Sequence, residues 1–126
     1  KTKIPYCFNR KETKSHGEGG IMAGSPLQGK VLIIDDVMTA GTAANEAIEI
    51  ISHTADAVLA GMIIGLDRKE SGGEDRPARE FIEQAYSIPV LNIIDIDDIL
   101  EFIRSSPEMS DFIKPIMKYR EAFGID

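Results

Sequence analysis

Two adjacent carboxylates, Asp35 and Asp36, follow a short apolar run and precede a turn of small residues that carries two hydroxyls. Neighbouring strand side chains point to opposite faces, so the two acids are expected to have different tasks. One carboxylate suits a ligand hydroxyl or a hydrated metal ion. The turn, residues 39–42, leads into a helical pattern, and free N–H groups at a helix start bind phosphate. The residue types therefore fit a ligand that carries a phosphate group.

Simpler interpretations of the same residues remain open. The acids can merely end a strand, and Thr42 can merely cap the helix that follows it. An apolar strand that ends in two acids also looks like a Walker B strand, but that interpretation gives no reason for the small-residue turn. The turn is not a Walker A loop, because it lacks the final Gly-Lys-Ser/Thr.

A second stretch with chemical potential lies at residues 10–20, which contain no apolar residue. Four potential cations occur there, in a chain whose net charge is −7: Arg10, Lys11, Lys14 and His16. A solvated surface loop is the plain interpretation. The contrast in charge and the glycines at 17, 19 and 20 favour a flexible lid that closes on an anion.

The elements that must position these groups alternate along the chain. Apolar runs at 31–34, 57–66 and 89–94 predict strands buried on both faces, and the first two end in charged residues. Helical spacing predicts helices at 42–53, 78–86, 96–105 and 107–123, and β-forming residues predict a strand at 3–8 and a short strand within 21–29. This order is typical of a single α/β domain, residues 1–126, with a parallel sheet and flanking helices.

The composition of the chain argues against two kinds of binding partner, nucleic acids and membranes. The net charge of −7 argues against a nucleic-acid surface. The longest apolar run is about half of the roughly 20 residues that a membrane helix needs, and no leader pattern is seen, so no membrane association is expected. The single cysteine, Cys7, cannot form an internal disulfide, which suits the cytoplasm.

The segment 31–43 resembles the phosphoribosyl pyrophosphate signature of the type I phosphoribosyltransferases. The resemblance implies that the acids meet the ribose hydroxyls and that the turn holds the 5′-phosphate. The positions it assigns to this substrate are Asp35, Asp36, Val37, Met38, Thr39, Ala40, Gly41, Thr42 and Ala43.

Residues 9–20 are similar to the flexible loop of the bacterial orotate phosphoribosyltransferases. That likeness implies that Arg10, Lys11, Lys14 and His16 bind the pyrophosphate group, with Lys14 and His16 as catalytic residues. It also implies a homodimer in which the loop of one subunit closes over its partner's site. The sequence Leu66-Asp67-Arg68 resembles the family motif whose arginine binds the orotate carboxylate, with Thr39 on the same side.

The resemblance implies a Rossmann-like fold of the type I phosphoribosyltransferases without its N-terminal part, since it covers only the later part of the family's chain. The implied reaction transfers the phosphoribosyl group of phosphoribosyl pyrophosphate to orotate and releases pyrophosphate, in UMP synthesis, with Mg²⁺ held mainly by the substrate. The chain by itself is expected to be a poor enzyme. Two alternatives stay open: a purine phosphoribosyltransferase, and a non-catalytic regulatory module that binds phosphoribosyl pyrophosphate.

Overall fold

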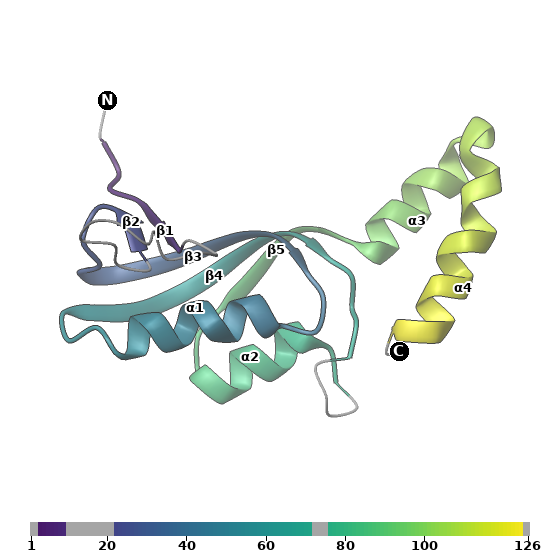
Figure 1. Ribbon diagram of the computed structural model, residues 1–126. Helices are drawn as coiled ribbons and strands as arrows, with labels where there is room; N and C mark the ends of the chain where they lie inside the picture. The colour runs from purple at the N-terminus through teal and green to yellow at the C-terminus, as the bar shows by residue number, and fades with distance from the viewer. Residues whose placement is uncertain (1–2, 10–21, 72–75, 125–126) are drawn as a thin grey trace, which may run out of the picture.

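A three-stranded parallel sheet forms the centre of the computed structural model, which describes residues 3–9, 22–71 and 76–124. Its strands are β3 (Gly29–Met38), β4 (Ala57–Asp67) and β5 (Val90–Asp95), in the order β3-β4-β5. Because all three strands run in the same direction, their carboxyl ends meet at one edge of the sheet (Figure 1). The predicted α/β class with a parallel sheet is confirmed.

Two helices cover the same face of this sheet (Figure 1). Helix α1 (Thr42–Ser52) connects β3 to β4, and α2 (Ala78–Tyr86) connects β4 to β5. Their apolar sides join the inward side chains of the strands in one core. Its members are Met38, Ala44, Ile48, Met62, Ile64, Ala78, Ile82, Ile88 and Val90.

The prediction that the strands are buried on both faces is wrong for one face of the sheet. On that face, opposite the helices, the apolar side chains are exposed. Ile34 of β3 is 76% exposed and Ile93 of β5 is 75% exposed. The reason is that both connecting helices lie on the other face, so no helix of the described residues covers this one (Figure 1). An apolar run indicates that both faces of a strand are suited to burial. It does not show that this chain supplies the element that buries the second face.

The N-terminal part forms a short antiparallel pair, β1 (Cys7–Asn9) with β2 (Met22–Gly24). The short strand within 21–29 is confirmed, whereas the strand predicted at 3–8 begins only at Cys7. β2 offers only three residues as partners, and Pro5 has no N–H to donate to a longer ladder.

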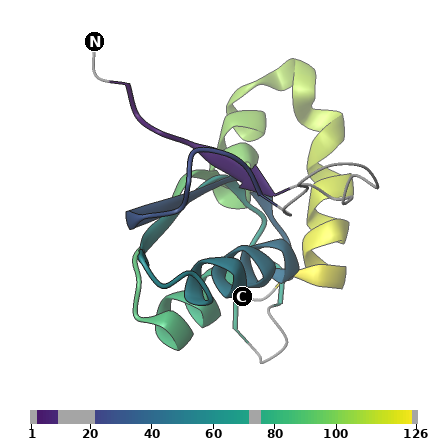
Figure 2. The ribbon, with the colours of Figure 1, turned by 60° about the vertical axis from the view of Figure 1, so that its left-hand side comes forward.

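The C-terminal elements stand beyond the carboxyl edge of the sheet (Figures 1 and 2). Helix α3 (Ile96–Ser105) has the predicted bounds, but the single helix predicted at 107–123 is divided. A 3₁₀ segment, η1 (Pro107–Phe112), precedes α4 (Ile113–Phe123). Pro115 lacks an N–H, so it is tolerated only in the first turn of an α-helix, and α4 accordingly starts two residues before it. No helix in the described ranges has the length and apolar character needed to cross a membrane.

Candidate functional site

The acid pair lies within strand β3 rather than after it, as the strand continues to Met38. Asp35 is in register with Ile64 of β4, and Met38 with Asp67. Because Asp35 and Asp36 are adjacent residues of this strand, their carboxylates point to opposite faces of the sheet. Asp35 is half-buried on the face that Ile33 shares with the core, and Asp36 is exposed on the open face.

Each carboxylate also accepts a hydrogen bond from the next residue's backbone. The N–H of Asp36 donates to Oδ1 of Asp35 at 2.9 Å, and the N–H of Val37 donates to Oδ1 of Asp36 at 2.7 Å. Each acid uses one oxygen in this way, and a carboxylate can accept further hydrogen bonds from a ligand hydroxyl. The strand thus fixes both acids without using up their acceptors.

The turn after β3 depends on Gly41, which has φ of 78°. This left-handed conformation is costly for a residue with a Cβ, and a Cβ here would also lie 3.3 Å from Cδ1 of Ile82 in α2. The absent side chain thus lets the turn pass close to α2 and start α1 at the carboxyl edge of the sheet. The backbone conformation therefore favours glycine here, and a Cβ would in addition require Ile82 to shift slightly.

Helix α1 begins without a side-chain cap among the described residues. Thr42 is its first residue and makes no capping hydrogen bond, so the interpretation of Thr42 as a simple cap is wrong. The first N–H groups of any helix lack partners within the helix and carry part of its positive dipole. They are therefore available, beside the Thr42 hydroxyl, for an anion.

These elements enclose a small hollow at the carboxyl end of β3. It is lined by Asp35, Val37, Met38, Thr39, Gly41, Thr42, Ala43 and Ala44. Seven of the predicted substrate residues are thus brought together, whereas Asp36 and Ala40 are not part of the lining. The volume of about 20 Å³ has room for one water molecule, so a larger group would bind at the open rim. Met38, which is 3% exposed, also belongs to the hydrophobic core.

Arg68 lies at the same edge of the sheet, just after β4, but in a different cluster. Its Nε is 3.2 Å from Oε1 of Glu70, and its guanidinium carbon is 4.7 Å from the ring centroid of Tyr119 in α4. The Tyr119 hydroxyl also donates to Glu70. Arg68 is therefore held by its neighbours rather than extended freely into solvent, and it does not line the hollow at β3. The basic residues Arg10, Lys11, Lys14 and His16 lie outside the described residues.

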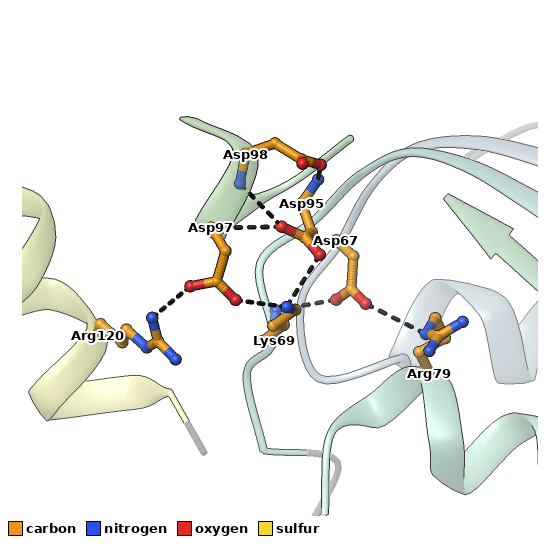
Figure 3. Close-up of polar contacts among 7 residues, drawn as sticks. All are labelled: Asp67, Lys69, Arg79, Asp95, Asp97, Asp98 and Arg120. Carbon is orange, nitrogen blue, oxygen red and sulfur yellow. Dashed lines mark hydrogen bonds and ion pairs between the residues drawn. The ribbon is translucent and has the colours of Figure 1, made fainter. Parts of the chain in front are cut away.

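Figure 3 shows an ionic junction that the sequence analysis does not predict. We define it as Lys69, Asp95, Asp97 and Arg120. Lys69 Nζ lies 2.9 Å from Asp95 Oδ2 and 2.5 Å from Asp97 Oδ2, and Arg120 Nη1 lies 2.5 Å from Asp97 Oδ1. The junction thus joins the loop after β4 to the start of α3 and to α4.

Charge pairing shifts the pKa values of three junction residues. Hydrogen bonds to Asp97 and then Asp95 raise the pKa of Lys69. The hydrogen bond from Lys69 lowers the pKa of Asp97. Partial burial acts to raise the pKa of Asp95, but the combined effect of Lys69 and of backbone N–H groups lowers it. All three groups are therefore more firmly ionised in the folded protein.

A buried acid connects this junction to the sheet. Asp67, 4% exposed, accepts a hydrogen bond from the backbone N–H of Lys69 at 2.9 Å and lies 3.4 Å from Nε of Arg79 in α2. Lys69 itself has φ of 52°, which is uncommon for a residue with a side chain. The turn after β4 is consequently fixed from two sides, by α2 and by the C-terminal helices.

The position of one junction residue, Asp95, could have been predicted from the sequence. Asp95 and Asp98, three residues apart before an apolar helical pattern, form a capping box in which Asp95 Oδ1 accepts from the N–H groups of Asp97 and Asp98. That spacing could have placed Asp95 at the start of α3. Nothing local indicates that Arg120 returns to Asp97, because this contact depends on how α4 packs.

Several known proteins that resemble this chain are named orotate phosphoribosyltransferase. The orotate phosphoribosyltransferase of Hahella chejuensis is 53% identical to it over 122 residues, which is 97% of this chain and 56% of the relative. That of Serratia proteamaculans is 48% identical over 122 residues, 97% of this chain and 57% of the relative. No family model matches the chain.

A solved structure gives the same result for the fold. The crystal structure of orotate phosphoribosyltransferase from Francisella tularensis matches with a TM-score of 0.69 and 34% sequence identity, over 96% of this chain and 56% of that one. The chain spans about half the length of the curated relatives that it matches. The likeness thus extends over nearly all of this chain but not over the whole of those proteins.

Proposed function

We propose that this chain belongs to the orotate phosphoribosyltransferase family and that the protein carrying it transfers a phosphoribosyl group from phosphoribosyl pyrophosphate to orotate. The products are orotidine 5′-phosphate and pyrophosphate, in the synthesis of UMP. The observation that carries the proposal is the hollow at the end of β3, where Asp35 and the uncapped start of α1 lie together. The 53% identity to a named relative supports the choice of reaction.

The sugar phosphate would bind along this hollow. Asp35 and Asp36 would accept hydrogen bonds from the ribose hydroxyls, one from each face of β3. The 5′-phosphate would lie at the rim, against the first N–H groups of α1 and the hydroxyls of Thr39 and Thr42. The small side chains of Ala40 and Ala43 leave the backbone accessible to it.

Departure of pyrophosphate requires positive charge that the hollow does not contain, because residues 35–44 include no lysine, arginine or histidine. We assign this task to Arg10, Lys11, Lys14 and His16, with Lys14 and His16 acting on the leaving group. The sugar would pass through an oxocarbenium-like state, so placing charge near the leaving oxygens is the main catalytic contribution.

Mg²⁺ is proposed to reach the site with the substrate. Within the described ranges, no group of three or more His, Cys, Asp or Glu side chains could hold a metal ion. This donor set fits an ion bound mainly by the pyrophosphate oxygens, with Asp35 or Asp36 contributing through water at most. When bound, the ion would neutralise part of the charge on the leaving group.

Orotate would be recognised at the next strand. The Arg68 guanidinium suits the planar orotate carboxylate, and Thr39 would lie on the side of the pyrimidine. We further infer a cytoplasmic homodimer in which the loop at 9–20 reaches the partner's site. This arrangement would allow one subunit to supply the charge that the other lacks.

The test is an activity assay on the full-length protein with orotate, phosphoribosyl pyrophosphate and Mg²⁺, followed by the loss of orotate absorbance. We expect turnover with orotate and none with hypoxanthine. The matched variant Asp35→Asn/Asp36→Asn should lose most of this activity while its melting temperature stays close to the original. Turnover with hypoxanthine instead would indicate a purine enzyme, and binding of phosphoribosyl pyrophosphate without turnover would indicate a regulator.

A further inference from the structure

Two of the three residues after β4 contact α4 directly, and the third is connected to it through an aspartate of α3. Arg68 and Glu70 contact Tyr119, and Lys69 is connected through Asp97 to Arg120. The backbone adds to this contact, because the N–H of Ser71 donates to the carbonyl of Phe123 at 3.3 Å. The loop that carries Arg68 is thus attached to α4 along its length.

The contacts around Arg68 restrict its guanidinium in two directions. Glu70 holds Nε, which limits rotation of the group in its own plane, and the ring of Tyr119 lies against its face. Tyr119 in turn is oriented by its hydroxyl, which donates to Glu70, and by the ring of Phe123 at a centroid distance of 5.1 Å. Each member of this group therefore restrains another.

An arginine needs such restraint to bind a carboxylate well. Its long side chain loses conformational entropy on binding, and a planar fork gains most when it already has the orientation that its partner requires. A face contact with an aromatic ring supplies that orientation and leaves the edges of the guanidinium for hydrogen bonding. Tyr119 lies fifty-one positions after Arg68 in the chain, so only the packing of α4 brings them together.

We propose that Tyr119, together with Glu70, is a positioning residue for the acceptor substrate: α4 holds Arg68 in the orientation that receives the orotate carboxylate. The inference rests on the function proposed above. In this proposal, α4 affects the affinity for orotate through Arg68, although α4 does not contact orotate itself.

Steady-state kinetics of the full-length protein can separate this role from a structural one. Tyr119→Leu removes the ring, and we expect the KM for orotate to rise about fivefold, the scale of one cation–π contact. The kcat and the KM for phosphoribosyl pyrophosphate should stay within about twofold, because the hollow at β3 does not involve α4. Tyr119→Phe keeps the ring and should restore most of the orotate affinity.

Two further variants complete the design. Phe112→Leu removes an aromatic ring from η1 that is 57% exposed, and it should leave both KM values unchanged. Glu70→Gln removes the charge that holds Nε of Arg68, and it should raise the KM for orotate even where Tyr119→Leu is too unstable to assay. A lower KM in Glu70→Gln would overturn the inference, because Glu70 would then be a competitor of the substrate.

The outcomes distinguish this inference from the proposed function. A full-length protein that does not use orotate would overturn both. A protein that uses orotate, but whose orotate KM is unchanged in Tyr119→Leu and Glu70→Gln, would overturn the positioning role alone. A parallel rise of both KM values in Tyr119→Leu would also contradict it, since it would indicate a general loss of structure.

Discussion

The carboxyl edge of the sheet contains two regions of opposite construction. At the end of β3, the hollow is built from backbone groups, small side chains and the uncapped start of α1. At the ends of β4 and β5, the junction is built from charged side chains that bind one another. The first region leaves polar groups available to a ligand, whereas the second satisfies them within the protein.

This difference indicates that an acidic residue should be judged as a candidate ligand-binding group by whether it already forms ion pairs within the protein. The acids at 35 and 36 form no ion pair among the described residues, while Asp95 and Asp97 share Lys69. Both sets are aspartates near the carboxyl ends of parallel strands of one sheet, β3 and β5. Their interaction partners distinguish the proposed ligand site from the structural contact.

The largest expected effect concerns the charge that the hollow lacks. Lys14→Ala should lower kcat by about 10²-fold or more, the scale of one lost preorganised charge contact. Lys30→Ala, which changes an exposed lysine at the other end of β3, is the matched control and should have little effect. Stopped-flow or steady-state assays of the full-length protein would measure both. Near-normal turnover in Lys14→Ala would remove the loop from the mechanism.

Exchange of one acid beside the hollow, and of the buried acid that connects the junction to the sheet, should separate binding from stability. Asp36→Asn should weaken phosphoribosyl pyrophosphate binding by about tenfold, the scale of one charge-assisted hydrogen bond, while the free energy of unfolding stays nearly unchanged. Asp67→Asn removes the charge of a buried acid beside Arg79, so it should cost about 1–3 kcal/mol of stability with little change in that affinity. Calorimetric titration and urea unfolding give the two quantities. The reverse pattern would interchange the roles assigned to the regions.

Two glycines with positive φ allow a matched test of the turn. Gly41→Ala and Gly29→Ala each place a Cβ in a left-handed conformation, at φ of 78° and 66°, which costs about 1–2 kcal/mol. Only Gly41 adjoins the hollow, and only there would the Cβ meet a neighbour, Cδ1 of Ile82 at 3.3 Å. Both variants should therefore unfold at lower urea concentration, but Gly41→Ala alone should weaken phosphoribosyl pyrophosphate binding. Equal affinities would show that the turn is not part of the site.

The smallest effect is the pH dependence of the junction. The folded pKa values of Asp95 and Asp97 are lowered, so their contribution to stability is present above the ordinary value of 3.8 and is lost as the pH falls through the folded values. Lys69 has a raised pKa, so its contribution is complete below 10.5 and is lost above that value.

Urea midpoints measured across pH would detect these changes. Asp97→Asn should flatten the acid limb of the profile, whereas Asp56→Asn, in the turn before β4, should leave it unchanged. An acid limb of the same steepness in Asp97→Asn would show that the junction does not stabilise the folded protein.

Sequence reasoning recovered what depends on local pattern. The helices at 78–86 and 96–105 have the predicted bounds, and α1 ends one residue earlier than expected, because apolar spacing and end residues define them. The gathering of Asp35, Thr39 and Thr42 around one hollow also followed from a strand, a turn and a helix in succession. These features can be predicted without knowing which distant segments of the chain pack together.

The features that sequence reasoning missed depend on packing between distant segments. β3 extends past its acids because β4 offers partners as far as Asp67, which no run of apolar residues reveals. The contact of Arg120 with Asp97 requires α4 to return toward the start of α3. The exposure of Ile34 depends on which face the helices cover. The division of the last helix is different, since Pro115 could have indicated it.

The central claim is that a sugar diphosphate binds where β3 meets α1. The most direct measurement is a titration of the isotope-labelled full-length protein with phosphoribosyl pyrophosphate and Mg²⁺, followed by the backbone amide resonances. We expect the largest shifts at the amides of residues 39–43, with those of Asp97 and Arg120 nearly constant. Shifts confined to other parts of the chain, with the amides of 39–43 unmoved at saturation, would contradict the account.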